Sequence, residues 1–166
     1  MTISSGFSIP TSYLHALTAP VRYAPIIGMA YGKVLALDYG TKNIGIACCD
    51  ELRVTVRPLP SLEHGRSRGL LDRILRIVRE NDIREVVVGI PLNMDGTSGE
   101  AVRRSERFME SLRDHLAVPL HGVDERLSTV EALEIWNGMS RRRQQKYRTV
   151  DSLAAAFILS RYLEES

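Results

Sequence analysis

Apolar and polar positions follow two patterns from residue 33 to the end of the chain. Short apolar runs are typical of strands covered on both faces, and apolar residues three and four apart are typical of helices. These patterns predict strands at 34–37, 44–49, 53–57, 86–90 and 120–123. The apolar stripes of the predicted helices fall at 70–78, 102–116, 130–136 and 150–158. This order predicts an α/β fold in which a mixed five-stranded sheet is flanked by helices on both faces.

Single residues predict where several of these elements begin or end. Pro58 is expected to stop the third strand, because proline cannot donate to a sheet ladder. Ser128 followed by Glu131 is a capping-box pattern for the third helix, and Thr149 can cap the fourth. Residues 141–148 lie between these helices and carry five basic side chains and no acid. We interpret them as a basic loop.

The first 32 residues differ in composition from the rest of the chain. They contain one charged side chain, Arg22, no acid, and three prolines that interrupt any helical period. The features of a secretory signal or a transit peptide are missing. We expect residues 1–32 to be a poorly ordered extension, or upstream sequence before a start at Met29, followed by one domain at 33–166.

Length and composition indicate a globular protein of one domain. The chain has 166 residues, 44% of them hydrophobic, and 22 Lys+Arg against 20 Asp+Glu give a net charge of +2. No apolar run approaches the ~20 residues that cross a bilayer, so we expect no membrane partner. Cys48 and Cys49 are adjacent and point to opposite faces of a strand, so they do not form a disulfide framework. A cytoplasmic location is therefore expected.

Acidic residues follow two predicted strands and begin the last helix. Asp38 lies at the carboxyl end of the first strand, where ligands gather in open α/β sheets, and we favour a functional role over a simple turn residue. Asp124 and Glu125 follow the fifth strand, either as cation ligands or as a local ion pair, and alternation puts only one of them on the shared face. Asp151 lies in the first turn of the last predicted helix, where the helix dipole favours an acid even if it has no function. Its position beside the apolar face of that helix would, however, direct it towards Asp38.

Three separated acids that converge suit metal-dependent hydrolysis of phosphodiesters. Mg²⁺ is typically held by one or two carboxylates together with water and phosphate oxygens. Two basic stretches could contact a nucleic acid, because residues 141–148 carry a charge of +5 and residues 66–79 carry +4. The stretch at 66–79 is the better candidate for an ordinary solvated helix face. Tyr147 could stack on an exposed base.

Four motifs together resemble the YqgF/RuvX family. They lie at 35–47 (LALDYGTKNIGIA), 88–96 (VGIPLNMDG), 123–129 (VDERLST) and 150–155 (VDSLAA). The resemblance implies an RNase H-like domain at 33–166 and a cytoplasmic nuclease that matures the 5′ end of pre-16S ribosomal RNA. It also implies that Asp38, Glu125 and Asp151 are the metal-binding acids. The family was earlier proposed to resolve Holliday junctions, by similarity to RuvC.

Two departures from related patterns affect the expected site. RuvC-type resolvases carry an acid at the end of the fourth strand, whereas this chain has Gly89-Ile90-Pro91-Leu92-Asn93 there. With a strand order of 3-2-1-4-5, Glu125 would lie two strands from Asp38, roughly 9–10 Å away before side-chain reach. We therefore expect a looser site, or one that substrate completes. Asn43 is neutral where relatives often place Arg, which removes a phosphate contact.

The main hypothesis is a hydrolase that uses Mg²⁺ or Mn²⁺ to cleave structured RNA such as pre-rRNA. Its candidate catalytic and metal-binding acids are Asp38, Glu125 and Asp151. Its candidate supporting residues are Asp124, Arg126, Thr41 and Lys42. Its candidate nucleic-acid-binding residues are Arg141, Arg142, Arg143, Lys146, Tyr147 and Arg148. The alternatives are a resolvase of branched DNA, which would act as a homodimer, and a catalytically weak nucleic-acid-binding assembly factor.

Overall fold

The computed structural model describes residues 31–63, 69–91, 99–125, 137–147 and 149–166. Several expectations lie outside this part of the chain: the extension up to residue 30, the helix at 130–136, Arg126 and Arg148. The side chains of Arg143, Lys146 and Tyr147 are also outside it. Among the described residues no helix is long and apolar enough to cross a membrane.

Five strands form one mixed sheet, in the order β3-β2-β1-β4-β5. Their bounds are β1 Lys33–Tyr39, β2 Asn43–Cys49, β3 Val56–Glu63, β4 Ile83–Ile90 and β5 Leu120–Asp124. The first three strands pair antiparallel, and β4 and β5 run parallel to β1. The carboxyl ends of β1, β4 and β5 therefore meet at one edge of the sheet, which confirms the predicted strand order.

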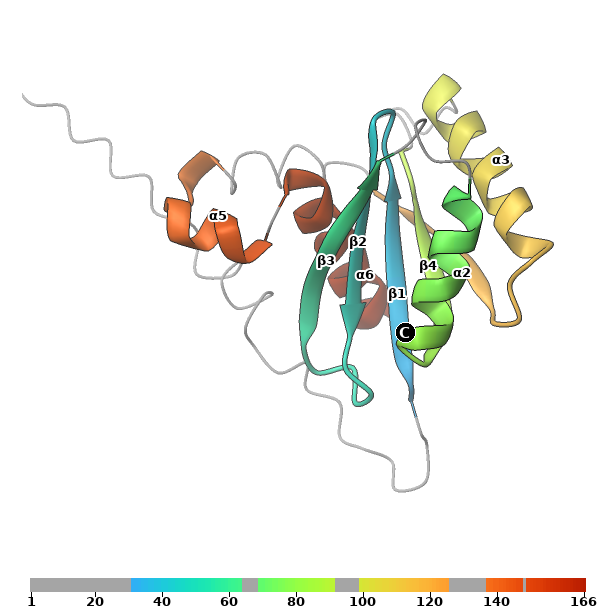
Figure 1. The fold of residues 1–166 in the computed structure, drawn as a ribbon, viewed down its shortest axis with the longest axis horizontal. Coiled ribbons are helices and arrows are strands. Elements are labelled where there is room, and N and C mark those ends of the chain that lie inside the picture. Colours follow the sequence, from blue (N-terminus) through green and yellow to red (C-terminus); the bar gives the residue numbers. More distant parts are fainter. Residues whose placement is uncertain (1–30, 64–68, 92–98, 126–136, 148) are drawn as a thin grey trace, which may run out of the picture.

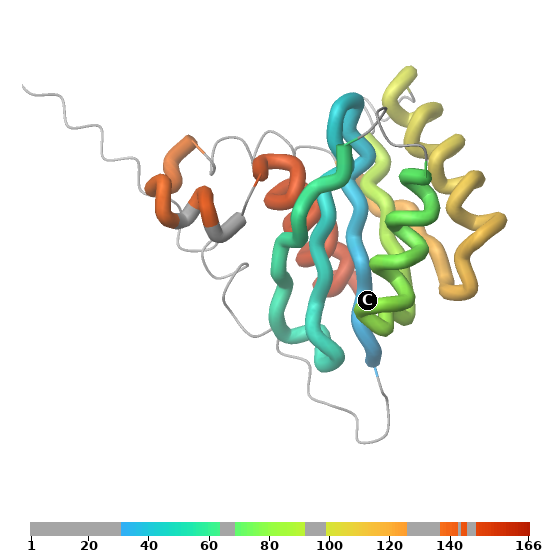
Figure 2. Tube along the Cα trace, in the orientation of Figure 1, coloured from blue at the N-terminus to red at the C-terminus, as the bar shows by residue number. Residues whose placement is uncertain are grey.

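Helices cover both faces of the sheet, as Figures 1 and 2 show. Helices α2 (Leu70–Glu80) and α3 (Glu100–Arg113) lie on one face, and α6 (Val150–Glu165) lies on the other. The short helix α5 (Arg141–Tyr147) lies to the side, near β3 and the start of α6.

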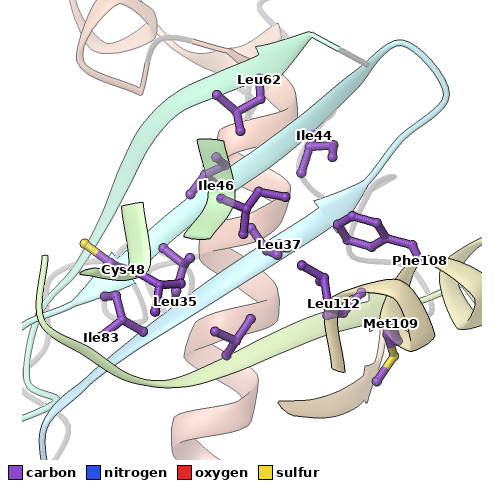
Figure 3. Packing of buried hydrophobic residues seen from close by; sticks show 14 residues of the cluster. Leu35, Leu37, Ile44, Ile46, Cys48, Leu62, Ile83, Phe108, Met109 and Leu112 are labelled. Carbon is purple, nitrogen blue, oxygen red and sulfur yellow. The ribbon is translucent and has the colours of Figure 1, made fainter. Parts of the chain in front are cut away.

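Strand alternation divides the core into two layers. In β1, Leu35 and Leu37 face α2 and α3, in the cluster drawn in Figure 3, whereas Val34 and Ala36 face α6. Both sets are fully buried. By the same alternation Asp38 faces α6 and Tyr39 faces the opposite layer. Asp38 and Tyr39, at the end of β1, therefore point to opposite faces of the sheet.

The third strand corrects the prediction that Pro58 ends it. Residues 50–55 form a turn, in which the Asp50 carboxylate accepts hydrogen bonds from the backbone N–H groups of Leu52, Val54 and Thr55. The strand then continues through Pro58 and Pro60. Because β3 is an edge strand, alternate residues need no ladder donor on their outer side, and proline is tolerated there.

The basic segment is a helix rather than the predicted loop. Residues 141–147 form α5, whose backbone N–H of Gln144 donates to the Ser140 carbonyl at 3.0 Å. Arg, Gln and Lys are good helix formers, and the segment has no glycine or proline. Thr149 caps α6 as predicted, because its hydroxyl accepts a hydrogen bond from the Ser152 N–H at 3.1 Å.

Candidate active site

Acidic and glycine residues meet where the carboxyl edge of the sheet faces α6. Asp38 is at the end of β1, Gly89 near the end of β4, and Glu125 directly after β5. Gly89 shares its face with Val87, and Glu125 shares its face with Val123, both of which pack against α6. Glu125 rather than Asp124 is therefore the acid on the same face as Asp38.

Asp38 and Glu125 are hydrogen-bonded to each other through their carboxyl groups. Both side chains are buried, with 9% and 8% of their surface exposed. Their strands are not neighbours, since β4 lies between β1 and β5. The expectation of a looser site is therefore corrected: the two acids are in direct contact.

Gly89 on the intervening strand makes this contact possible. A Cβ at this position would lie 2.9 Å from Glu125 Cδ and 2.6 Å from Ile158 Cδ1, so a side chain there would require the Glu125 carboxyl group to shift. The backbone N–H of Glu125 donates to the Ile90 carbonyl at 3.1 Å, which extends the β4–β5 register beyond the end of the strand. The Glu125 side chain thus passes over β4 at Gly89, which has no side chain.

Burial and mutual repulsion make the pair difficult to ionise. Burial, followed by the charge of Asp151, raises the pKa of Asp38 to about 6, although the hydrogen bond with Glu125 acts in the opposite direction. Burial, followed by the charges of Asp38 and Asp124, raises the pKa of Glu125 to about 8. At neutral pH the pair therefore tends to hold one proton, shared in the hydrogen bond between the two carboxyl groups. Two acids whose pKa values are driven apart in this way are typical of functional sites.

The first turn of α6 brings Asp151 to the same region. Gly45, which pairs with Asp38 across β1 and β2, lies against this turn, and a Cβ there would be 3.1 Å from the Ser152 backbone nitrogen. The Ser152 hydroxyl donates to the Leu59 carbonyl at 2.6 Å, which ties the helix to β3. Asn43 Nδ2 donates to Asp151 Oδ2 at 3.2 Å. Asn43, which stands where relatives often place Arg, therefore orients one of the acids of the site.

The donor set suits a hard divalent cation. In the described part of the chain no three Asp, Glu, His or Cys side chains are grouped closely enough to hold a metal ion. Asp38 and Glu125 nevertheless offer two adjacent carboxyl groups, and the charge of Asp151 is close enough to act on Asp38. Mg²⁺ needs only one or two carboxylates when water and phosphate oxygens complete its shell. The pair therefore fits a cation that binds in place of the shared proton.

The other expected site residues lie outside this group. Asp124 ends β5 one residue before Glu125, so its side chain belongs to the opposite face. Thr41 and Lys42 are exposed in the turn between β1 and β2. Arg141 and Arg142 are exposed on α5, whose neighbours are α6 and β3.

Sequence reasoning missed the two glycines that bring the acids together. Gly45 and Gly89 stand inside strands, where glycine is otherwise unfavourable and often marks a close approach of other atoms. That signal was present in the sequence, but it does not say which group approaches.

Comparisons with known proteins agree on one family. The family model RuvX, described as Holliday junction resolvase, matches residues 32–165. A protein of Lachnospira eligens is 39% identical over 135 residues, which cover 80% of this chain and 96% of the relative. A protein of Lactobacillus johnsonii is 39% identical over 137 residues, with 80% and 95% covered. Both relatives are named "Putative pre-16S rRNA nuclease".

Solved structures confirm the fold. RuvC of T. thermophilus in complex with a Holliday junction substrate aligns with a TM-score of 0.52 at 14% identity, covering 80% of this chain and 94% of RuvC. The Holliday junction resolvase of fowlpox virus aligns with a TM-score of 0.50 at 14% identity, covering 81% and 99%. These similarities confirm the expected RNase H-like architecture.

Proposed function

The chain belongs to the RuvX family, and from this membership we propose that it is a nuclease that hydrolyses phosphodiester bonds in structured nucleic acid. We assign it the 5′-end processing of pre-16S rRNA, and its relatives are named as nucleases of this RNA. The observation that carries the proposal is the buried Asp38–Glu125 pair at the carboxyl edge of the sheet.

Asp38 and Glu125 would hold a divalent cation, Mg²⁺ or Mn²⁺, with Asp151 beside them. When bound, such an ion supplies Lewis-acid stabilisation of the charge that develops on the phosphodiester. Both carboxyl groups would have to be ionised to hold such an ion. Asn43 keeps the Asp151 carboxylate oriented through its hydrogen bond.

A cytoplasmic location suits this function. Cys48 and Cys49 are both free and buried, and such thiols persist in a reducing compartment. Ribosomal RNA precursors are the substrate class assigned to the relatives by name.

A cleavage panel tests the proposal. Pre-rRNA leader, single strands and four-way DNA junctions are each incubated with Mg²⁺, Mn²⁺ or chelator. We expect metal-dependent cleavage of the leader, complete loss in Asp38→Asn, and full activity in Glu164→Gln, a control at an exposed position of α6. Cleavage by Asp38→Asn at the rate of the unaltered protein would refute the role of the pair.

The description of the matching family favours Holliday junction resolution as a second candidate. A resolvase cuts two strands symmetrically and would act as a homodimer. Paired cuts in the four-way junction by a dimeric protein would support it, whereas cleavage of the RNA leader alone by a monomer would exclude it. Absence of acid-dependent metal uptake in calorimetric titration would instead favour the assembly-factor alternative.

A further inference from the structure

A groove opens on the face of the sheet opposite the acidic pair. It lies between α2 and α3, with a volume of about 420 Å³, within the usual range of ligand pockets. Its lining residues are Tyr39, Leu70, Leu71, Arg104, Arg107, Phe108 and Ser111. Figure 1 shows the two helices side by side on this face, with α6 behind the sheet.

Aromatic rings form one wall of the groove. The rings of Tyr39 and Phe108 are stacked, with centroids 4.1 Å apart and planes inclined by 13°. Phe108 itself is buried and anchored in the core, and Figure 3 shows it beside the end of β1. The core therefore supports this wall from behind, and flat rings of this kind are surfaces on which nucleic-acid bases stack.

Positive charge lines the same groove. Arg104 and Arg107 are three residues apart on α3 and so lie on one side of the helix. The guanidinium of Arg107 is 3.8 Å from Glu100, but both side chains are largely exposed, and such surface pairs exchange partners at little cost. Both arginines act on the Tyr39 phenol, since their charges oppose the rise in its pKa that burial causes. The described lining residues include no acid.

The groove and the acidic pair lie on opposite faces of the sheet, and both include a residue from the end of β1. Asp38 and Tyr39 are consecutive at the end of β1, and alternation directs Asp38 to the α6 face and Tyr39 to the groove. A strand of nucleic acid that crosses the carboxyl edge of β1 would meet the carboxyl groups and then the arginines. Charge complementarity and this continuity select a phosphate-bearing strand as the occupant.

We propose that the groove between α2 and α3 binds a nucleotide of the substrate strand next to the one that is cleaved. Arg104 and Arg107 contact its phosphate, and the Tyr39–Phe108 wall contacts its base. This inference rests on the proposed nuclease function for its choice of ligand, and it adds a binding surface on the face of the sheet opposite the acidic pair.

Binding and cleavage together test the inference. Fluorescence anisotropy in chelator measures the Kd of a labelled single-stranded RNA of about 12 nucleotides, a length typical of such sites. The double variant Arg104→Gln/Arg107→Gln should raise the Kd about tenfold and reduce the slope of log affinity against log salt by about 0.7, because the contact with one phosphate is lost. Arg113→Gln, an exposed arginine in the last turn of α3, is the matched control and should change neither value.

Steady-state cleavage of the same RNA in Mg²⁺ separates the groove from the chemistry. In the double variant KM should rise about tenfold while kcat stays within about twofold, because the interaction contributes to binding and not to the reacting group. An unchanged Kd and an unchanged salt slope would overturn the groove, even where cleavage persists. If neither the unaltered protein nor any variant cleaves RNA, the nuclease function fails, and the Kd values still decide the groove.

Discussion

Replacing Glu125 by Gln should remove a pH dependence of folding that originates in the acidic pair. The amide keeps a donor for the Asp38 carboxylate but cannot ionise, so the packing over Gly89 is nearly unchanged. In the unaltered protein the pKa of Glu125 is raised from 4.5 to about 8, mainly by burial. The folded state therefore binds this proton more tightly than the unfolded state.

The sign and size of the effect follow from proton linkage. A carboxyl group whose pKa is raised in the folded state stabilises the fold fully at pH values below its pKa in the unfolded state. For Glu125 this stabilisation is lost as the pH rises through about 8. Between about pH 6.5 and 8.5 the loss is about 2 kcal/mol, at about 1.4 kcal/mol for each tenfold change in proton affinity. The Asp38 carboxyl, whose pKa is raised to about 6, completes most of its own titration below this window.

Urea unfolding in chelator at several pH values measures this difference. The free energy of unfolding of the unaltered protein should fall across the window, whereas Glu125→Gln should be nearly flat. Glu164→Gln, at an exposed position of α6, is the control and should follow the unaltered protein. Parallel curves for the unaltered protein and Glu125→Gln would refute the assigned burial and coupling of the pair.

Three further substitutions test how the acids are held. Gly89→Ala should lower the free energy of unfolding by about 1–3 kcal/mol through overpacking and abolish Mg²⁺ uptake in calorimetry, whereas Gly138→Ala, where a Cβ meets nothing within 4 Å, should do neither. Asn43→Ala should lower kcat about 10- to 100-fold with little change in melting temperature, because it frees the Asp151 carboxylate, and an unchanged kcat would contradict the positioning role. Thr149→Ala should cost about 1 kcal/mol in urea unfolding through loss of the α6 cap, and a variant as stable as the unaltered protein would contradict that cap.

Local pattern was sufficient to predict most elements of this fold. Strands β1, β2 and β4 need only an apolar layer on each face, and their own residues indicate this burial. The cap of α6 depends only on residues at the start of that helix. Two predictions were wrong. The rule that proline ends a strand holds in the centre of a sheet, and the prediction of a basic loop left helix propensity out of account. Pro58 lies in an edge strand, and the basic segment 141–147 consists of good helix formers.

The sequence by itself predicted acids at the ends of the first and fifth strands, because the apolar runs end there, and the resemblance to the family supplied the strand order. It could not determine that Asp38 and Glu125 are in contact. Their strands are separated by β4, and the separation is bridged only because Gly89 offers no side chain where Glu125 crosses. The place where the Glu125 side chain passes over β4 is fixed by the register between β4 and β5 and by the packing of α6. Both depend on contacts between segments that are far apart in the chain. The raised pKa values of the pair follow from the same packing, because burial is decided by all the layers together.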